Sequence, residues 1–185
     1  TAKMLGLDFP GGPEVERAAR DGNGERFKLP RPMKGREGCH FSFSGLKTAV
    51  RHAIDGLGEG PLNKQDVADL SASFQAAAAD VLADRTRNAI GEFRSAHPDA
   101  ATMVIAGGVA ANQYLRARLE VLAADEGFDL IAPPQALCTD NAAMIAWAGV
   151  ERLEEGLIDG LDFAPRPRWP LDPDAPPAAY AGVKA

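Results

Sequence analysis

The sequence predicts an α/β protein in which a long helix accompanies a small parallel sheet. Apolar residues recur at three- and four-residue steps from the expected cap Asn63 toward His97, as on one face of a long helix. After Pro98, two short and largely apolar runs, 102–106 and 128–132, suit buried parallel strands. A helical stretch between the two runs supplies the crossover that parallel strands need.

We expect three parts along the chain. Residues 1–100 form a mainly helical part with a loop insertion, and residues 101–170 form an α/β part. Residues 171–185 are rich in Pro and Ala and are predicted to be a disordered tail. The chain does not begin with Met, and its first residues have the pattern of a helix interior, so we expect a fragment or a processed product.

The segment before the long helix begins with helices and turns. Thr1–Leu7 has the pattern of an amphipathic helix, and Pro13 suits the first position of a helix that runs to Arg20. The sequence Asp21–Gly24 then ends this helix, because Gly and Asn favour turns. The Pro, Gly and basic residues of 26–38 predict an extended connection.

A short strand and a second helix are predicted next. The alternation in Cys39–Phe43 suits a strand with the two Phe side chains on one face and His40 and Ser42 on the other. Ser44 can cap a helix over 45–57, since its hydroxyl can accept a hydrogen bond from a free backbone amide.

The α/β part contains two further helices. Gly107–Gly108 turns the chain after the first strand, and 111–124 is predicted to be a helix. After the second strand, another helix begins near Thr139 or Asp140 and runs to Leu153.

Composition excludes several classes of protein. The 185 residues are 45% hydrophobic, which is enough for a globular core. No run of about 20 apolar residues and no signal peptide occur, so neither membrane insertion nor secretion is indicated. Two cysteines without zinc-type Cys and His spacing favour a reducing compartment, and we expect a cytoplasmic protein.

The charge distribution bears on nucleic-acid binding. A net charge of −6 argues against a protein whose whole surface binds nucleic acid. Two local basic clusters exist: Arg31, Lys34, Arg36 and Lys47, and then Arg166 with Arg168. Either cluster could contact a phosphate backbone or could be ordinary solvated loop charge.

The first chemical signal is the sequence 103–112, Met-Val-Ile-Ala-Gly-Gly-Val-Ala-Ala-Asn. Two glycines after a strand let a ligand approach the backbone closely, and the following helix start offers free amides to a polar group. A tight strand-to-helix turn needs similar glycines, so both interpretations stay open. The Lys and Ser/Thr of a phosphate-binding Walker loop are missing.

The second signal is the segment 137–146 around Asp140. Asp140 stands at an expected helix start, where its carboxylate could cap free amides. The same position, after a strand, is also where α/β proteins place metal ligands and catalytic groups. Cys138 suggests a nucleophile, but no histidine is placed to serve as its base, so a buried and inert thiol is favoured.

Four motifs together resemble one family, the TsaD proteins, which are tRNA adenosine threonylcarbamoyltransferases once described as glycoproteases. The motifs are Phe-Ser-Phe-Ser-Gly-Leu-Lys-Thr at 41–48, Ala-Gly-Gly-Val-Ala-Ala-Asn at 106–112, Cys-Thr-Asp-Asn at 138–141 and Arg-Pro-Arg-Trp-Pro-Leu at 166–171. They occur in the family's order from Thr1 to about Leu171. Two small departures are Ala110, where Ser is common, and Ala142, where Gly is common.

The resemblance implies the C-terminal part of an actin-like ATPase (ribonuclease H-like) lobe with a helical insertion. It implies transfer of a threonylcarbamoyl group from its adenylate to the exocyclic amine of the adenosine beside the anticodon. By the same resemblance, Asp140 is a ligand of one divalent metal ion, iron or zinc. Gly12 and Asn112 are substrate contacts, and the nucleotide ligand is ATP or threonylcarbamoyl-adenylate.

The resemblance also implies partners and leaves alternatives open. The paired histidines of the metal site and a Ser-Gly-Gly-His loop belong to a preceding half, so the expected partners are that N-terminal half, tRNA, and TsaB-type and TsaE-type proteins, without a membrane. Catalytic side chains are not identified, and we expect the chain to be inactive alone. A non-catalytic actin-like dimerisation module is the alternative function. The glycoprotease alternative lacks any nucleophile-base or zinc-protease signature.

Overall fold

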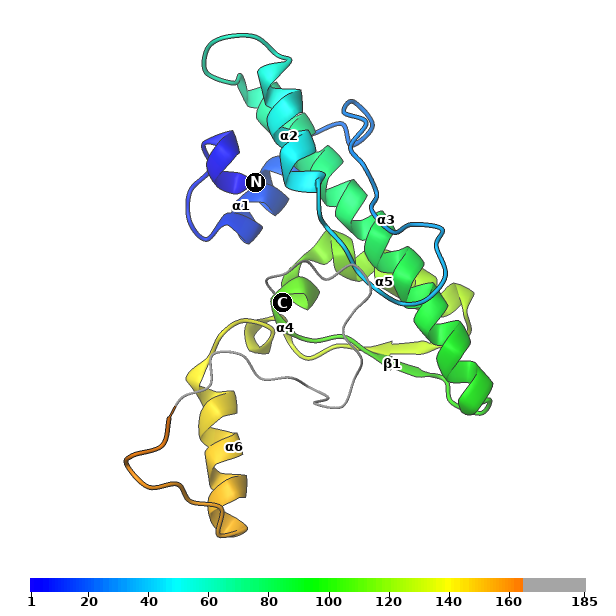
Figure 1. Ribbon diagram of the computed structural model, residues 1–185, viewed down its shortest axis with the longest axis vertical. Coiled ribbons are helices and arrows are strands. Elements are labelled where there is room, and N and C mark those ends of the chain that lie inside the picture. The colour runs from blue at the N-terminus through cyan, green and yellow to red at the C-terminus, as the bar shows by residue number, and fades with distance from the viewer. Residues whose placement is uncertain (165–185) are drawn as a thin grey trace. The chain divides into compact units, whose positions relative to one another are not determined.

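The computed structural model describes residues 1–164 and divides the chain into two compact units, 1–140 and 141–185 (Figure 1). The predicted tail 171–185 and the basic pair Arg166 and Arg168 lie outside the described residues. The first unit contains, in order, η1 (Ala2–Leu5), α1 (Gly11–Ala19), α2 (Leu46–Asp55), α3 (Lys64–Ala96), β1 (Thr102–Val104), α4 (Gly107–Ala111), α5 (Gln113–Asp125), β2 (Asp129–Ile131) and η2 (Gln135–Leu137). The second contains α6 (Ala142–Glu154).

Helix α3 is the element around which the first unit is built. The predicted cap is confirmed, because Asn63 Oδ1 accepts a hydrogen bond from the backbone N–H of Asp66 over 2.8 Å. Toward its first half, Ala77 packs in a core cluster with residues of α2 and the preceding loop: Leu29, Leu46 and Val50. Toward its second half, Ala83 and Ile90 pack in clusters with α5 and the start of β2: Leu119, Leu122, Ala123 and Phe128.

Residues 21–38 run alongside α3 and are tied to it by side chains (Figure 1). Near the start, the backbone N–H of Asn23 donates to Asp69 Oδ1 over 2.7 Å. This bond, followed by the bond from Arg26, holds the pKa of the Asp69 carboxyl below its usual range. The contact therefore stabilises the fold above the ordinary carboxyl pKa and is lost as the pH falls through the lowered one.

The far end of residues 21–38 is held by a buried guanidinium. Arg85 is fully buried and donates to the carbonyl oxygens of Gly38 over 2.9 Å and Arg36 over 2.7 Å, while pairing with Asp84. Arg31 pairs with Asp80 of α3 over 2.9 Å. Lys34 lies 3.9 Å from the same carboxylate, so two members of the predicted basic cluster are engaged in ion pairs within the fold.

The two predicted strands are confirmed and pair in parallel, with Thr102 opposite Asp129, Met103 opposite Leu130 and Val104 opposite Ile131. The strands are shorter than predicted, and only one face is covered. Met103 and Leu130 pack against the α3–α5 clusters. Val104 and Ile131 are 65% and 55% exposed, so no described residue buries the other face. The cover that apolar strands are expected to have on this second face would therefore have to come from outside residues 1–164.

The predicted strand over Cys39–Phe43 is wrong, because these residues have no partner strand and lie outside any regular element. The cap at Ser44 is also wrong. Gly45 precedes α2 with a φ of 80°, a conformation that glycine adopts without strain, and no side chain caps the helix. The Ser44 backbone N–H instead donates to Ser42 Oγ over 3.2 Å.

Three helical segments also differ from the prediction. Helix α1 begins at Gly11 rather than Pro13. The helix predicted over 111–124 is confirmed as α5 but begins later, at Gln113, and a separate short helix, α4, precedes it where only a turn was predicted. Thr1–Leu7 contains only a short 3₁₀ helix. Among residues 1–164, no helix is both long enough and apolar enough to cross a lipid bilayer.

Gly22 lies where the chain leaves α1 and passes close to α3. A Cβ atom there would stand 2.0 Å from the carbonyl oxygen of Ala68 and 2.9 Å from the Cβ of Ala72. Because backbone atoms of a long helix cannot move aside cheaply, Gly22→Ala is expected to lower the free energy of unfolding by about 1 to 3 kcal/mol. Gly24→Ala is the matched control, since its Cβ would come no closer than 3.5 Å to another atom. Equal urea midpoints for the two variants would contradict the expected clash.

Candidate functional site

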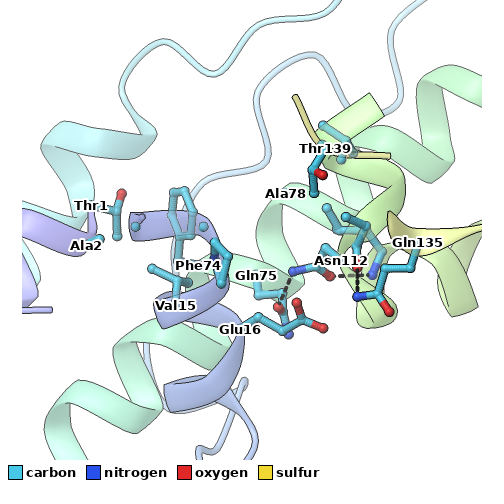
Figure 2. A pocket seen from close by; sticks show the side chains of 17 residues that line it. Thr1, Ala2, Val15, Glu16, Phe74, Gln75, Ala78, Asn112, Gln135 and Thr139 are labelled. Carbon is cyan, nitrogen blue, oxygen red and sulfur yellow. Dashed lines mark hydrogen bonds between the residues drawn. The ribbon is translucent and has the colours of Figure 1, made fainter. Parts of the chain in front are cut away.

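A cavity of about 550 Å³ opens between α1, α3 and the α4–α5 junction (Figure 2). Its walls are largely apolar, with Val15, Phe74 and Leu115 among them, and its polar groups are few. The polar side chains come from three separate stretches of the chain: Thr1 and Glu16, then Gln75, then Asn112, Gln135 and Thr139. A small set of polar groups in an apolar hollow is typical of a site for a small organic ligand.

Helix α1 brings Gly12 to this cavity. The first residue of the helix, Gly11, has to be glycine, because a Cβ there would stand 2.7 Å from Ala2 Cβ. Gly12 has no atom within 4 Å of where its Cβ would be, so its backbone faces open space in the cavity wall. A ligand can therefore approach the main chain of Gly12 closely.

The Gly-Gly sequence after β1 brings Asn112 to the same cavity. Gly107 has a φ of 75°, which the tight turn requires and which other residues adopt only with strain. Helix α4 then has five residues and ends at Ala111, so that Asn112 separates it from α5. There Asn112 caps α5, with its Oδ1 accepting from the Leu115 N–H over 2.9 Å, and its Nδ2 donates to Gln75 Oε1 over 3.0 Å. The structure thus places Gly12 and Asn112, which come from distant sequence motifs, in one cavity.

Besides Thr1 and Thr139, three polar residues of the cavity have no place among the site residues expected from the sequence. Glu16 accepts a hydrogen bond from the Gln113 N–H over 2.8 Å, and Gln135 Nε2 donates to the Ala111 carbonyl over 3.2 Å. The third is Gln75 on α3. Glu16 stands four residues after Gly12, so helical spacing from a suspected contact could have found it. Gln75 could have been noticed as an amide within the buried part of the long helix.

Asp140 lies at the end of the first unit and is exposed, and it is not among the residues that line the cavity, although Thr139 is. The capping role considered for Asp140 is wrong. Helix α6 begins at Ala142, and its cap is Asn141, whose Oδ1 accepts from the Met144 N–H over 3.1 Å. Within residues 1–164, the Asp140 side chain forms no hydrogen bond or ion pair, so its carboxylate is available to a ligand outside them.

The described residues fit a metal ion only in part. Among residues 1–164, no three His, Cys, Asp or Glu side chains gather closely enough to hold one. Asp140 offers a single free carboxylate, which suits hard and borderline divalent ions. A metal ion held by Asp140 would need further ligands from outside the described residues.

Cys138 is buried, as the sequence favoured. It is 1% exposed, and its thiol donates to the carbonyl oxygen of Pro133 over 3.6 Å. A thiol in this environment is inert as a nucleophile. Cys138 is also not among the residues that line the cavity, whose polar groups can bind and orient a ligand.

Comparison with known proteins gives a consistent result. A family model described as "TsaD: tRNA N6-adenosine threonylcarbamoyltransferase" matches residues 1–147. Proteins named tRNA N6-adenosine threonylcarbamoyltransferase are similar to this chain. The Rhodospirillum rubrum protein is 64% identical over 185 residues, which are 100% of this chain and 51% of that protein. The Brucella anthropi protein is 59% identical over 184 residues, or 98% and 51%. The Paramagnetospirillum magneticum protein is 56% identical over 180 residues, or 97% and 52%.

Proposed function

The chain belongs to the TsaD family, and we propose that it supplies the C-terminal half of an enzyme that modifies tRNA. The chain spans about half the length of the curated relatives it matches. The proposed reaction transfers a threonylcarbamoyl group from threonylcarbamoyl-adenylate to the exocyclic amine of the adenosine beside the anticodon. The chain alone is proposed to be inactive, because the other half of the site lies outside it.

The observation that carries this proposal is the shared cavity of Gly12 and Asn112. The family resemblance selects these two residues from motifs that lie 100 positions apart in the sequence. A volume of about 550 Å³ suits part of a nucleotide, with apolar walls for a planar base. The open main chain at Gly12 and the carboxamide of Asn112 then provide polar contacts that orient the ligand.

The proposed task of these residues is to hold the adenylate so that its carbonyl carbon faces the incoming amine. Positioning of this kind lowers the barrier because the reacting atoms no longer have to find each other. Asp140 is proposed as one ligand of a divalent metal ion, iron or zinc, with the other ligands supplied by the N-terminal half. When bound, such an ion polarises a carbonyl or phosphoryl oxygen as a Lewis acid.

The remaining parts of the proposal follow from the family. The mixed helices and parallel strands suit the C-terminal lobe of an actin-like fold with a helical insertion, in which residues 1–100 form a mainly helical part with a loop insertion. The proposed partners are tRNA, the N-terminal half, and TsaB-type and TsaE-type proteins, in the cytoplasm.

Asn112→Ala is expected to weaken binding of ATP, used in place of the adenylate, by about 1 to 3 kcal/mol in the full-length protein, because a polar contact in the cavity is lost. Titration calorimetry measures this difference. Asn63→Ala is the matched control. Asn63 also caps a helix through its side chain, at α3, but does not line the cavity. An Asn112→Ala protein that binds ATP as tightly as its parent would refute the proposed contact.

A further inference from the structure

Gln75 lies on α3, and its side chain reaches the cavity that Gly12 and Asn112 line (Figure 2). Only 8% of the residue is exposed. Its carboxamide has therefore lost most of its contact with bulk water, and a buried amide without partners is costly. Nearby buried positions of α3 hold Ala77 and Ala79, so a polar side chain at position 75 is not required by packing alone.

The backbone fixes the direction of the hydrogen bonds around Gln75. The Leu115 N–H can only donate, and it donates to Asn112 Oδ1 over 2.9 Å. The other end of the Asn112 carboxamide is therefore its Nδ2, which donates to Gln75 Oε1 over 3.0 Å. Gln75 must therefore present Oε1 to Asn112, and its Nε2 points elsewhere.

Gln75 Nε2 has no acceptor among residues 1–164. It is nevertheless not sealed inside the protein, since the one described side-chain atom that is both buried and unpaired is Ser71 Oγ. Gln75 lines two hollows, the cavity shared with Gly12 and Asn112 and an adjoining one that Tyr114 also lines, and the Nε2 group is reachable from this space. A free donor on a nine-tenths buried side chain is suited to a ligand that brings an acceptor.

We propose that Gln75 is a positioning and recognition residue of this site. Its Oε1 holds the carboxamide of Asn112 in a single orientation, and its Nε2 donates a hydrogen bond to an acceptor atom of the nucleotide, such as a hydroxyl oxygen, a carbonyl oxygen or an unprotonated ring nitrogen. This inference rests on the proposed nucleotide-binding function of the cavity. It adds a chemical requirement, because a ligand that presents only donors at this point would leave Gln75 unsatisfied.

The test is Gln75→Glu in the full-length protein, with ATP as the probe in titration calorimetry. The introduced carboxylate can still accept from Asn112 Nδ2, but it places an acceptor where Gln75 Nε2 donates. ATP affinity is therefore expected to fall on the order of 10- to 100-fold at neutral pH. The variant keeps the size and shape of the side chain, so a lost cavity wall cannot explain such a fall.

The pH dependence separates recognition from a structural role. A protonated carboxyl has a carbonyl acceptor and an O–H donor, which can take the places of the amide's carbonyl and NH2 groups, so affinity is expected to recover as the introduced group binds a proton. Its pKa is ordinarily about 4.3, and burial raises it. Glu16 lines the same cavity and Arg20 lines an adjoining hollow, so the parent protein is measured at each pH and the ratio of the two affinities is used.

Gln75→Met provides the second variant, because it keeps the approximate size but removes both hydrogen bonds. Its affinity for ATP is expected to be low at every pH, without recovery. Equal affinities of the parent, Gln75→Glu and Gln75→Met would overturn the role of Gln75 and leave the proposed function intact. A Gln75→Glu protein that stays weak after protonation would show a structural role only. A parent protein that binds no ATP would overturn the proposed function and this inference with it.

Discussion

Replacing Asp140 by Asn is expected to remove most of the metal from the full-length protein and to lower threonylcarbamoyl transfer by about a hundredfold or more. The carboxylate is exposed and has no hydrogen bond or ion pair among residues 1–164, so a metal ion would not have to break an existing contact. An amide oxygen is neutral and a much poorer ligand. Loss of even an outer partner of a metal ligand costs about 10- to 100-fold, and a direct ligand should cost at least as much.

Elemental analysis of the purified protein measures the metal, and a transfer assay measures the activity. Asp129→Asn is the matched control, since Asp129 is another exposed carboxylate of the same unit, on β2. Helix α6 keeps its cap in Asp140→Asn, because that cap is Asn141. A folded Asp140→Asn protein with unchanged metal content would remove Asp140 from the proposed metal site.

The isolated chain is expected to self-associate. Helix α6 buries none of its residues among those described, although it carries several large apolar side chains: Met144, Ile145, Trp147, Val150 and Leu153. Ile145 and Trp147 are 74% and 72% exposed. Burying one such side chain contributes about 1.5 to 3 kcal/mol of free energy. Contact of this helix face with another apolar surface would therefore be strongly favourable. In the first unit, the uncovered face of the two-stranded sheet exposes Val104 and Ile131 as a further apolar surface.

Light scattering and a hydrophobic dye test this expectation on Thr1–Ala185 expressed alone. Association should weaken in Ile145→Glu, which places a charge in the exposed apolar surface. It should not change in Glu154→Gln, a substitution at an exposed polar position of the same helix. Activity that appears only when the chain is mixed with an N-terminal half would support the proposed division of the site. A monomer with a cooperative thermal transition and no dye binding would show that the core is complete without a partner.

Sequence patterns succeeded where the structure is decided locally or by strong periodicity. The long helix and its Asn63 cap follow from repeated apolar spacing and from the chemistry of a free amide. The parallel strands follow from two apolar runs separated by a helical crossover. Gly12 and Asn112 came from a family resemblance, and their roles remain predictions, although both line one cavity.

The failures occurred where tertiary contacts decide. The alternation of Cys39–Phe43 looks like a strand, but a strand needs a neighbour, and alternation alone cannot supply one. Asp140 and Asn141 are adjacent and both can cap a helix, so sequence could not tell which would do so. The helical pattern of α3 does not distinguish Gln75 as a site residue. Its role depends on a hydrogen bond with Asn112, which lies 37 residues further along the chain.

The attachment of residues 21–38 to α3 has a consequence for the order of folding. Each of these hydrogen bonds joins residues that lie far apart in the sequence. The separation is 46 residues for Asn23 and Asp69, 47 for Gly38 and Arg85, and 49 for Gly35 and Asp84. Closing the first loop of this size costs on the order of 3 kcal/mol in chain entropy, and the later ties then close almost freely because the register is already set. The carboxylates and the guanidinium that receive the segment are arranged only once α3 is helical. Helix α3 should therefore form first. Residues 21–38 should then form their first hydrogen bond to α3, and the other hydrogen bonds should follow quickly. The slow step is this first contact between distant stretches of the chain.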